Sequence, residues 1–165
     1  MKKKTSSITH LMPCSVTLLT AGTAHKKDAM TATCMFISED LPHLVVSVEK
    51  NSTSHHLIEE TGDFVLNIVS REQVNLARQL GASHGADVDK FKKFKIPTAP
   101  GSATAASLIR GSLASLECKV ITSFPAYRHT IYLAEVVNYK VDDAQTPVAW
   151  YKGGYFVLGA ECKTM

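Results

Sequence analysis

The chain has 165 residues, of which 45% are hydrophobic and 20% are charged, and its formal net charge is +3. This length and composition predict one globular domain over residues 1–165 and exclude a disordered protein. The small net charge argues against a nucleic-acid-binding surface.

The cysteines and the apolar segments further limit which kinds of protein this chain can be. The four cysteines are far apart, with no Cys-x-x-Cys pair, so we expect neither a metal centre nor a redox dithiol. Scattered thiols suit the reducing cytoplasm. No apolar run reaches the roughly 18 residues of a membrane helix. His10 and Pro13 also interrupt the first apolar segment, so we expect no signal peptide and no membrane partner.

The first elements along the chain are predicted to be strands. Residues 15–20 favour one strand, and residues 28–37 favour a second after a small basic loop. Small side chains at Ala29, Ala32 and Thr33 would leave the backbone open to a flat ligand. The same residues would equally allow close packing between strands, and both interpretations stay open.

Residues 44–62 change in the middle from the pattern of a strand to that of a helix. Aliphatic residues at 44–48 predict a strand. The later residues that share one helical face are Ser54, Leu57, Ile58 and Thr61, and Gly62 stands where a helix usually stops.

The start of this predicted helix is rich in hydrogen-bond donors. Lys50, Ser52, Thr53 and Ser54 bring one cation and three hydroxyls to a point where the first N–H groups are free and the helix dipole is positive. Such a helix start favours a phosphate. The alternative interpretation is that Ser52 or Thr53 only caps the helix.

Two more helices are predicted in the middle of the chain. Residues 63–69 read as an interior strand, and residues 74–80 read as a helix that ends at Gly81. Asp87 is expected to cap a short helix that contains Lys90. Lysines stand at 90, 92, 93 and 95, and we expect three of these four on a solvated face.

The C-terminal half is predicted to be mostly strands. Residues 96–106 read as a surface connection, and residues 108–124 as a half-exposed strand in which Glu117 and Lys119 alternate with apolar residues. Residues 128–141 form a long strand with apolar residues on one face, and residues 147–158 supply the last strands around a Gly153-Gly154 turn.

About seven strands with two or three short helices predict a mainly β fold, a β-barrel with short helical inserts. The chain contains neither Gly-x-Gly-x-x-Gly nor Gly-x-x-x-x-Gly-Lys-Ser/Thr. A Rossmann domain and a P-loop are therefore not supported.

The order of these motifs resembles the flavin reductase-like, FMN-binding split-barrel family, which includes flavoredoxins and reductase components of two-component monooxygenases. The resemblance spans about residues 12–159. Residues 28–33 are similar to the strand that this family places beside the flavin ring, and residues 50–58 are similar to its phosphate-binding turn. Gly85 and the later Asp89-Lys90-Phe91 resemble a further stretch of the family. His129 matches a histidine at a strand start, and residues 151–155 match the closing strand.

The resemblance implies a split β-barrel that binds FMN and passes hydride from NAD(P)H to a flavin. It implies His129 as the catalytic residue, orienting the nicotinamide or stabilising charge on the reduced flavin. It implies partners, namely NAD(P)H, a free flavin or a protein electron acceptor, and a second copy in a homodimer; no metal is implied. The cofactor-binding residues it implies are Met30, Thr31, Ala32, Thr33, Lys50, Ser52, Thr53, Ser54, Lys90 and Tyr155.

Several positions depart from the family pattern. Asp28 stands where Asn is usual, Cys34 where an aromatic residue is common, Ser52 where an Arg often contacts phosphate, and Tyr127-Arg128 replaces Gly-Asp. These departures keep alternatives open: a flavin-carrying electron-transfer protein without its own NAD(P)H reductase activity, a haem- or deazaflavin-binding barrel, or a ligand-free structural dimer. His129 could also be an ordinary surface histidine.

Overall fold

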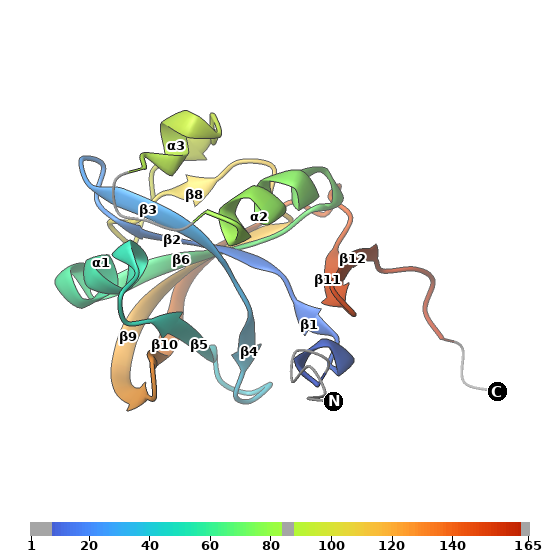
Figure 1. Cartoon of the computed structure of the whole chain (residues 1–165), viewed down its shortest axis with the longest axis horizontal. Helices are drawn as coiled ribbons and strands as arrows, with labels where there is room; N and C mark the ends of the chain where they lie inside the picture. The colour runs from blue at the N-terminus through green and yellow to red at the C-terminus, as the bar shows by residue number, and fades with distance from the viewer. Residues whose placement is uncertain (1–7, 84–87, 163–165) are drawn as a thin grey trace, which may run out of the picture.

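The computed structural model describes residues 8–83 and 88–162, and its centre is a seven-stranded antiparallel sheet (Figure 1). The sheet has the order β3-β2-β6-β9-β10-β5-β4. Its strands are β2 (Thr17–Gly22), β3 (Lys27–Ala32), β4 (Cys34–Phe36), β5 (His43–Glu49), β6 (Asp63–Ile68), β9 (Ala114–Ala126) and β10 (His129–Val141).

The sheet curls into a barrel because its two edge strands are consecutive in the chain. Only Thr33 separates β3 from β4, yet these strands occupy opposite ends of the strand order. The single strand predicted over residues 28–37 is therefore wrong, since the chain crosses from one edge to the other at Thr33. This curled sheet is the predicted split barrel.

Smaller elements surround the barrel. A second sheet has the order β1-β11-β12 and lies at one end of the molecule (Figure 1). The elements outside the main sheet are β1 (Cys14–Ser15), β7 (Thr98–Ala99), β8 (Leu108–Ile109), β11 (Val148–Tyr151), β12 (Gly154–Val157), α1 (Thr53–Thr61), α2 (Val74–Gly81), α3 (Lys90–Lys93) and the 3-10 turns Thr9–Leu11 and Arg71–Gln73. Within the described ranges, no helix is long and apolar enough to cross a membrane.

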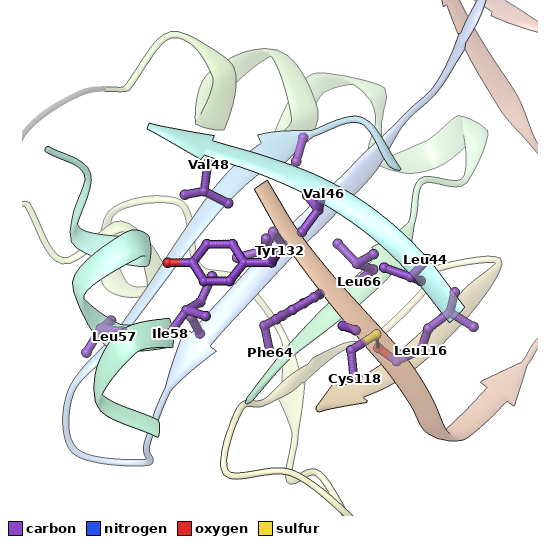
Figure 2. Close-up of a cluster of buried hydrophobic side chains, with 14 residues drawn as sticks. Leu44, Val46, Val48, Leu57, Ile58, Phe64, Leu66, Leu116, Cys118 and Tyr132 are labelled. Carbon is purple, nitrogen blue, oxygen red and sulfur yellow. Dashed lines mark hydrogen bonds between the residues drawn. The ribbon is translucent and has the colours of Figure 1, made fainter. Parts of the chain in front are cut away.

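The barrel interior is filled by side chains from α1 and from both halves of the sheet. Figure 2 shows Ile58 of α1 and Phe64 of β6 near the ring of Tyr132 of β10, and Leu57 of α1 belongs to the same cluster. Tyr132 is 1% exposed, and its hydroxyl donates a 2.5 Å hydrogen bond to Glu59. α1 is thereby fixed to the barrel by apolar contacts and by one polar contact.

The predicted helix after the central strand is confirmed at both ends. Ser52 is the N-cap, and its side chain accepts from the His55 N–H, so the capping interpretation holds for Ser52. Gly62 follows the helix with a φ of 69°, in the left-handed region that glycine adopts without steric cost.

The next predicted elements are also confirmed. β6 pairs with β2 on one side and β9 on the other, as expected of an interior strand, and α2 ends at Gly81. α3 is capped by Asp89, whose side chain accepts from the Lys92 N–H. The predicted cap Asp87 lies outside the described residues, as does Gly85.

Strand β9 corrects one prediction. Glu117 was expected on an exposed face, but it is 1% exposed, whereas Lys119 is exposed as predicted. The Glu117 carboxylate accepts from the N–H groups of Ser102, Ala103 and Thr104, so it ties the connection over residues 101–106 to the barrel. A single sequence does not reveal this, because the donors come from a loop distant in the chain.

Strand β10 buries a different face from the apolar one. Thr130, Tyr132 and Ala134 are buried, whereas the apolar residues on the other face, beginning with Ile131 and Leu133, are half-buried or exposed. Strand alternation identifies which residues share a face, and the pairing with β5 and β9 decides which face turns inward.

Candidate functional site

Two adjoining cavities lie where the barrel closes. The first, of about 240 Å³, extends from the start of α1 to α3, and the second, of about 450 Å³, extends along β3 to the second sheet. They share Met30, Thr31, Ser47 and His129 as lining residues, so they form one continuous groove. Ala32 and Thr33 line only the second cavity.

The start of α1 presents free donors to the first cavity. The N–H groups of Thr53 and Ser54 occupy the first two helical positions, where no intrahelical partner exists, and neither bonds to another described residue. The Thr53 hydroxyl likewise has no partner among the described residues, and Thr53 lines the cavity. An anion in this cavity would meet the N–H and the hydroxyl of Thr53 at the positive end of the helix dipole.

The other two predicted hydroxyls are occupied. The Ser52 hydroxyl donates to the Glu49 carbonyl at 2.7 Å while accepting from the His55 N–H at 3.1 Å. Ser54 is fully buried, and its hydroxyl donates to Asp28 Oδ2 at 2.7 Å. Ser52 lines the cavity as a helix cap, and Ser54 lies behind the cavity wall.

Asp28 and Lys90 form a buried ion pair at the wall of the first cavity. Lys90 Nζ lies 2.9 Å from Asp28 Oδ1 and donates to the Ala29 carbonyl at 2.8 Å. An ammonium has three N–H donors, so one remains for a ligand in the cavity that Lys90 lines. Lys92, Lys93 and Lys95 are exposed, which confirms that three of the four lysines lie on a solvated face.

Lys50 is not among the described residues that line the two cavities. Its ammonium donates to the Tyr127 carbonyl at 3.0 Å, and its N–H donates to the Arg128 carbonyl at 3.0 Å. Lys50 therefore joins the start of α1 to the turn between β9 and β10. Its predicted contact with phosphate would require the side chain to leave this turn.

His129 lies at the junction of the two cavities. It is the first residue of β10, directly opposite Glu49 on β5, and both residues line the first cavity. The next residue, Thr130, is 2.9 Å from His55 Nε2 through its hydroxyl. Burial lowers the pKa of His55, and the Glu59 carboxylate partly offsets this effect, so His55 is neutral near pH 7. The start of β10 is thus joined to α1 on both sides of His129.

The second cavity has aromatic walls. Tyr155 and Trp150 line it opposite the small residues of β3. Burial raises the pKa of the Tyr155 hydroxyl, with a smaller opposing effect from the Arg78 guanidinium. The phenol is therefore neutral at physiological pH, and this cavity offers a flat, largely apolar surface to a ring system.

The structure adds lining residues that the sequence reasoning did not select. Asn51 and Glu49 line the first cavity, and Trp150 lines the second. Asn51 lies inside the predicted phosphate turn, so its position next to three hydroxyls was a usable signal. Trp150 and Glu49 sit in ordinary strand patterns, and only the folded barrel brings them to the groove.

Comparison with known proteins gives one domain-level match and many relatives. The model of the "Flavin reductase like domain" matches residues 9–159. The NADH-dependent FMN reductase AsuE2 of Streptomyces nodosus subsp. asukaensis is 25% identical over 154 residues, covering 92% of this chain and 82% of the relative. An NADH-dependent flavin reductase of a Rhodococcus species is 28% identical over 146 residues, with coverages of 85% and 77%.

Solved structures agree on the fold. The Streptomyces globisporus C-1027 NADH:FAD oxidoreductase SgcE6 superposes with a TM-score of 0.84 at 24% identity, covering 94% of this chain and 92% of that one. Because the domain match spans nearly the whole chain, the protein belongs to the flavin reductase-like domain family.

Proposed function

We propose that this protein is an NADH-dependent flavin reductase that binds FMN in the groove between the start of α1 and the second sheet. The observation that carries the proposal is the continuity of this groove. It joins the free donors of Thr53 to an aromatic-walled cavity, and His129 stands where the two parts meet. The relatives named as NADH-dependent FMN and flavin reductases support the same reaction.

The residues present suit a flavin. Thr53, Asn51 and the remaining N–H of Lys90 are donors suited to a phosphate, and the small residues Ala32 and Thr33 leave the β3 side of the second cavity open to a ring. The two cavities together fall in the range of roughly 300–1,000 Å³ that is common for small-molecule sites. A bound flavin would supply the acceptor for a hydride from reduced nicotinamide, leaving the oxidised nicotinamide as product.

The chain's own residues would bind, orient and exclude water. Trp150 and Tyr155 shield one side of the second cavity, and His129 is placed to hold the carboxamide of a nicotinamide or to donate to negative charge on the reduced ring. The proposed roles of Met30 and Thr31 are to contact the ring from β3, because both line the two cavities.

We also propose a homodimer formed by the single domain. Strand β4 and the loop that follows it expose Met35, Phe36, Ile37 and Leu41, each between 49% and 64%. β4 is an edge strand of the main sheet, and edge strands with exposed apolar residues are usually covered. A second copy would cover this surface.

The reaction is tested by mixing the purified protein with FMN and NADH under anaerobic conditions in a stopped-flow instrument. We expect a rapid loss of the visible flavin absorbance that depends on the protein. A flavin that binds but is reduced only by a protein donor would support the electron-carrier alternative. Calorimetry with FMN, FAD and riboflavin tests the choice of FMN, for which the phosphate donors at α1 predict a tighter complex than for riboflavin.

A further inference from the structure

Arg78 of α2 lies beside Tyr155, a lining residue of the second cavity, and its guanidinium has no anionic partner among the described residues. Its guanidinium carbon lies 5.3 Å from the ring centroid of Tyr155, which lines that cavity. In the part of the chain that the structure describes, the Arg78 side chain has no carboxylate partner and no hydrogen bond, and the residue is exposed. A stacked guanidinium is held in place yet keeps its five donors.

The backbone around Arg78 is anchored to the cavity from the other side. The neighbouring residue Ala77 is fully buried, and its carbonyl accepts a 2.6 Å hydrogen bond from the Thr31 hydroxyl. Thr31 lines both cavities. Arg78 is thus positioned by Thr31 through the helix and by Tyr155 through its ring, next to the part of the groove that Tyr155 lines.

Charge suggests which ligand Arg78 serves. Among the described residues, no lysine or arginine lines the second cavity. The flavin phosphate is assigned to Thr53 and Lys90 in the first cavity, so it does not need Arg78. The other ligand of the proposed reaction carries a pyrophosphate, which a guanidinium binds well through paired hydrogen bonds.

We propose that Arg78 is a specificity-determining residue that binds the pyrophosphate of the nicotinamide dinucleotide. This inference rests on the proposed function. It adds that Arg78 makes the protein prefer a dinucleotide donor to a dihydronicotinamide without phosphates. Tyr155 has two roles: it forms a wall of the ring cavity and it supports the guanidinium. An Arg at this site contributes binding energy without contacting the reacting atoms, so it acts on the KM for the donor and leaves kcat unchanged.

The test compares two electron donors in the FMN-loaded full chain. NADH carries the pyrophosphate, whereas 1-benzyl-1,4-dihydronicotinamide has the same reacting ring and no phosphate. We expect Arg78→Ala to raise the KM for NADH about tenfold, the loss of one charge-assisted contact at an exposed site. The kcat, the KM for FMN and the rate with the benzyl donor should stay at parental values. Arg78→Lys should recover part of the loss, and Lys119→Ala, an exposed cation on β9, should change nothing.

Two results would overturn the inference while leaving the proposed function intact. One is an unchanged KM for NADH in Arg78→Ala, and the other is an equal loss with both donors, which would mean that Arg78 acts only through Tyr155. Calorimetry of NAD⁺ binding to the FMN-loaded parent and to Arg78→Ala gives a readout independent of turnover. A parent that binds FMN but neither oxidises NADH nor binds NAD⁺ would overturn both the inference and the donor half of the proposed function.

Discussion

The Asp28 carboxylate and the Lys90 ammonium lie 2.9 Å apart, and each side chain is only 7% exposed. Asp28 also accepts from the fully buried Ser54 hydroxyl. One buried carboxylate therefore connects β3, α1 and α3 around the first cavity. At position 28 the aspartate supplies a charged acceptor that balances the Lys90 ammonium.

Removing the cation of this pair should weaken the fold. Lys90→Met leaves the Asp28 carboxylate buried without a counter-ion, and we expect the free energy of unfolding to fall by about 3–5 kcal/mol. Urea denaturation of the ligand-free protein measures this. Lys92→Met is the control, since its ion pair with Asp89 is largely exposed, and it should cost less than about 1 kcal/mol. Similar losses for the two variants would refute the structural role of the pair.

The hydroxyls of Thr53 and Ser52 should differ in what they contribute, one to FMN binding and the other to stability. Thr53→Val removes the free hydroxyl, and we expect FMN affinity to fall at least about tenfold with little change in stability. Ser52→Ala removes the cap and should cost about 1 kcal/mol of stability. Fluorescence titration with FMN and urea denaturation give the two quantities. Unchanged FMN affinity in Thr53→Val would place the phosphate elsewhere.

His129 should affect the rate of flavin reduction but not the affinity for the flavin. Because hydride transfer requires close positioning of the nicotinamide, His129→Ala should slow flavin reduction by NADH about a hundredfold while FMN affinity stays within a factor of two or so. Single-turnover stopped-flow measurements resolve this step. His25→Ala, an exposed histidine between β2 and β3, is the matched control. Fast reduction in His129→Ala would move the catalytic assignment to another group in the groove.

Glu117 should make the fold sensitive to acid. Burial raises the pKa of its carboxyl, but hydrogen bonds from the Ala103 N–H and from Asn138, Thr104 and Ser102 outweigh burial and lower the pKa to about 2. A lowered pKa in the folded state stabilises the fold above the unfolded value near 4.5, and this stabilisation is lost as the pH falls toward 2.

The matching variant is Glu117→Gln, which keeps the shape and removes the charge. We expect it to be about 3 kcal/mol less stable than the parent at pH 7, and the difference should shrink between pH 4.5 and pH 2. Urea denaturation across this pH range measures both curves. Glu135→Gln, at an exposed position of β10, should change stability by less than about 0.5 kcal/mol. If the difference in stability between Glu117→Gln and the parent did not change with pH, the negative charge of Glu117 would not be the source of the stabilisation.

The oligomeric state can be measured directly. Light scattering at micromolar concentration should give twice the 17.9 kDa of one chain. Met35→Asp places a charge among the exposed apolar residues of the edge strand β4 and should shift the mass toward the monomer. A parental mass of one chain would count against the dimer.

Some structural elements of this protein can be predicted from the sequence and others cannot. The helix between Ser52 and Gly62 is predictable because its cap, its apolar face and its terminal glycine are all local. The selection of Lys90 from a cluster of lysines came from the resemblance to the family, and the buried pair with Asp28 gives it a physical basis. Glu117 was missed because its donors lie in a loop that only tertiary structure brings near.

The hydrogen bonds from Lys50 to Tyr127 and between His55 and Thr130 have a kinetic consequence. They attach the start of α1 to the strand end that carries His129. A flavin phosphate bound at the start of α1 would therefore be linked, through these two hydrogen bonds, to the strand end that carries His129. The dinucleotide would then meet a histidine whose strand end is connected to the bound flavin. We expect the two ligands to add in a fixed sequence, with flavin before NADH, and initial-rate patterns with NAD⁺ as product inhibitor would reveal that sequence.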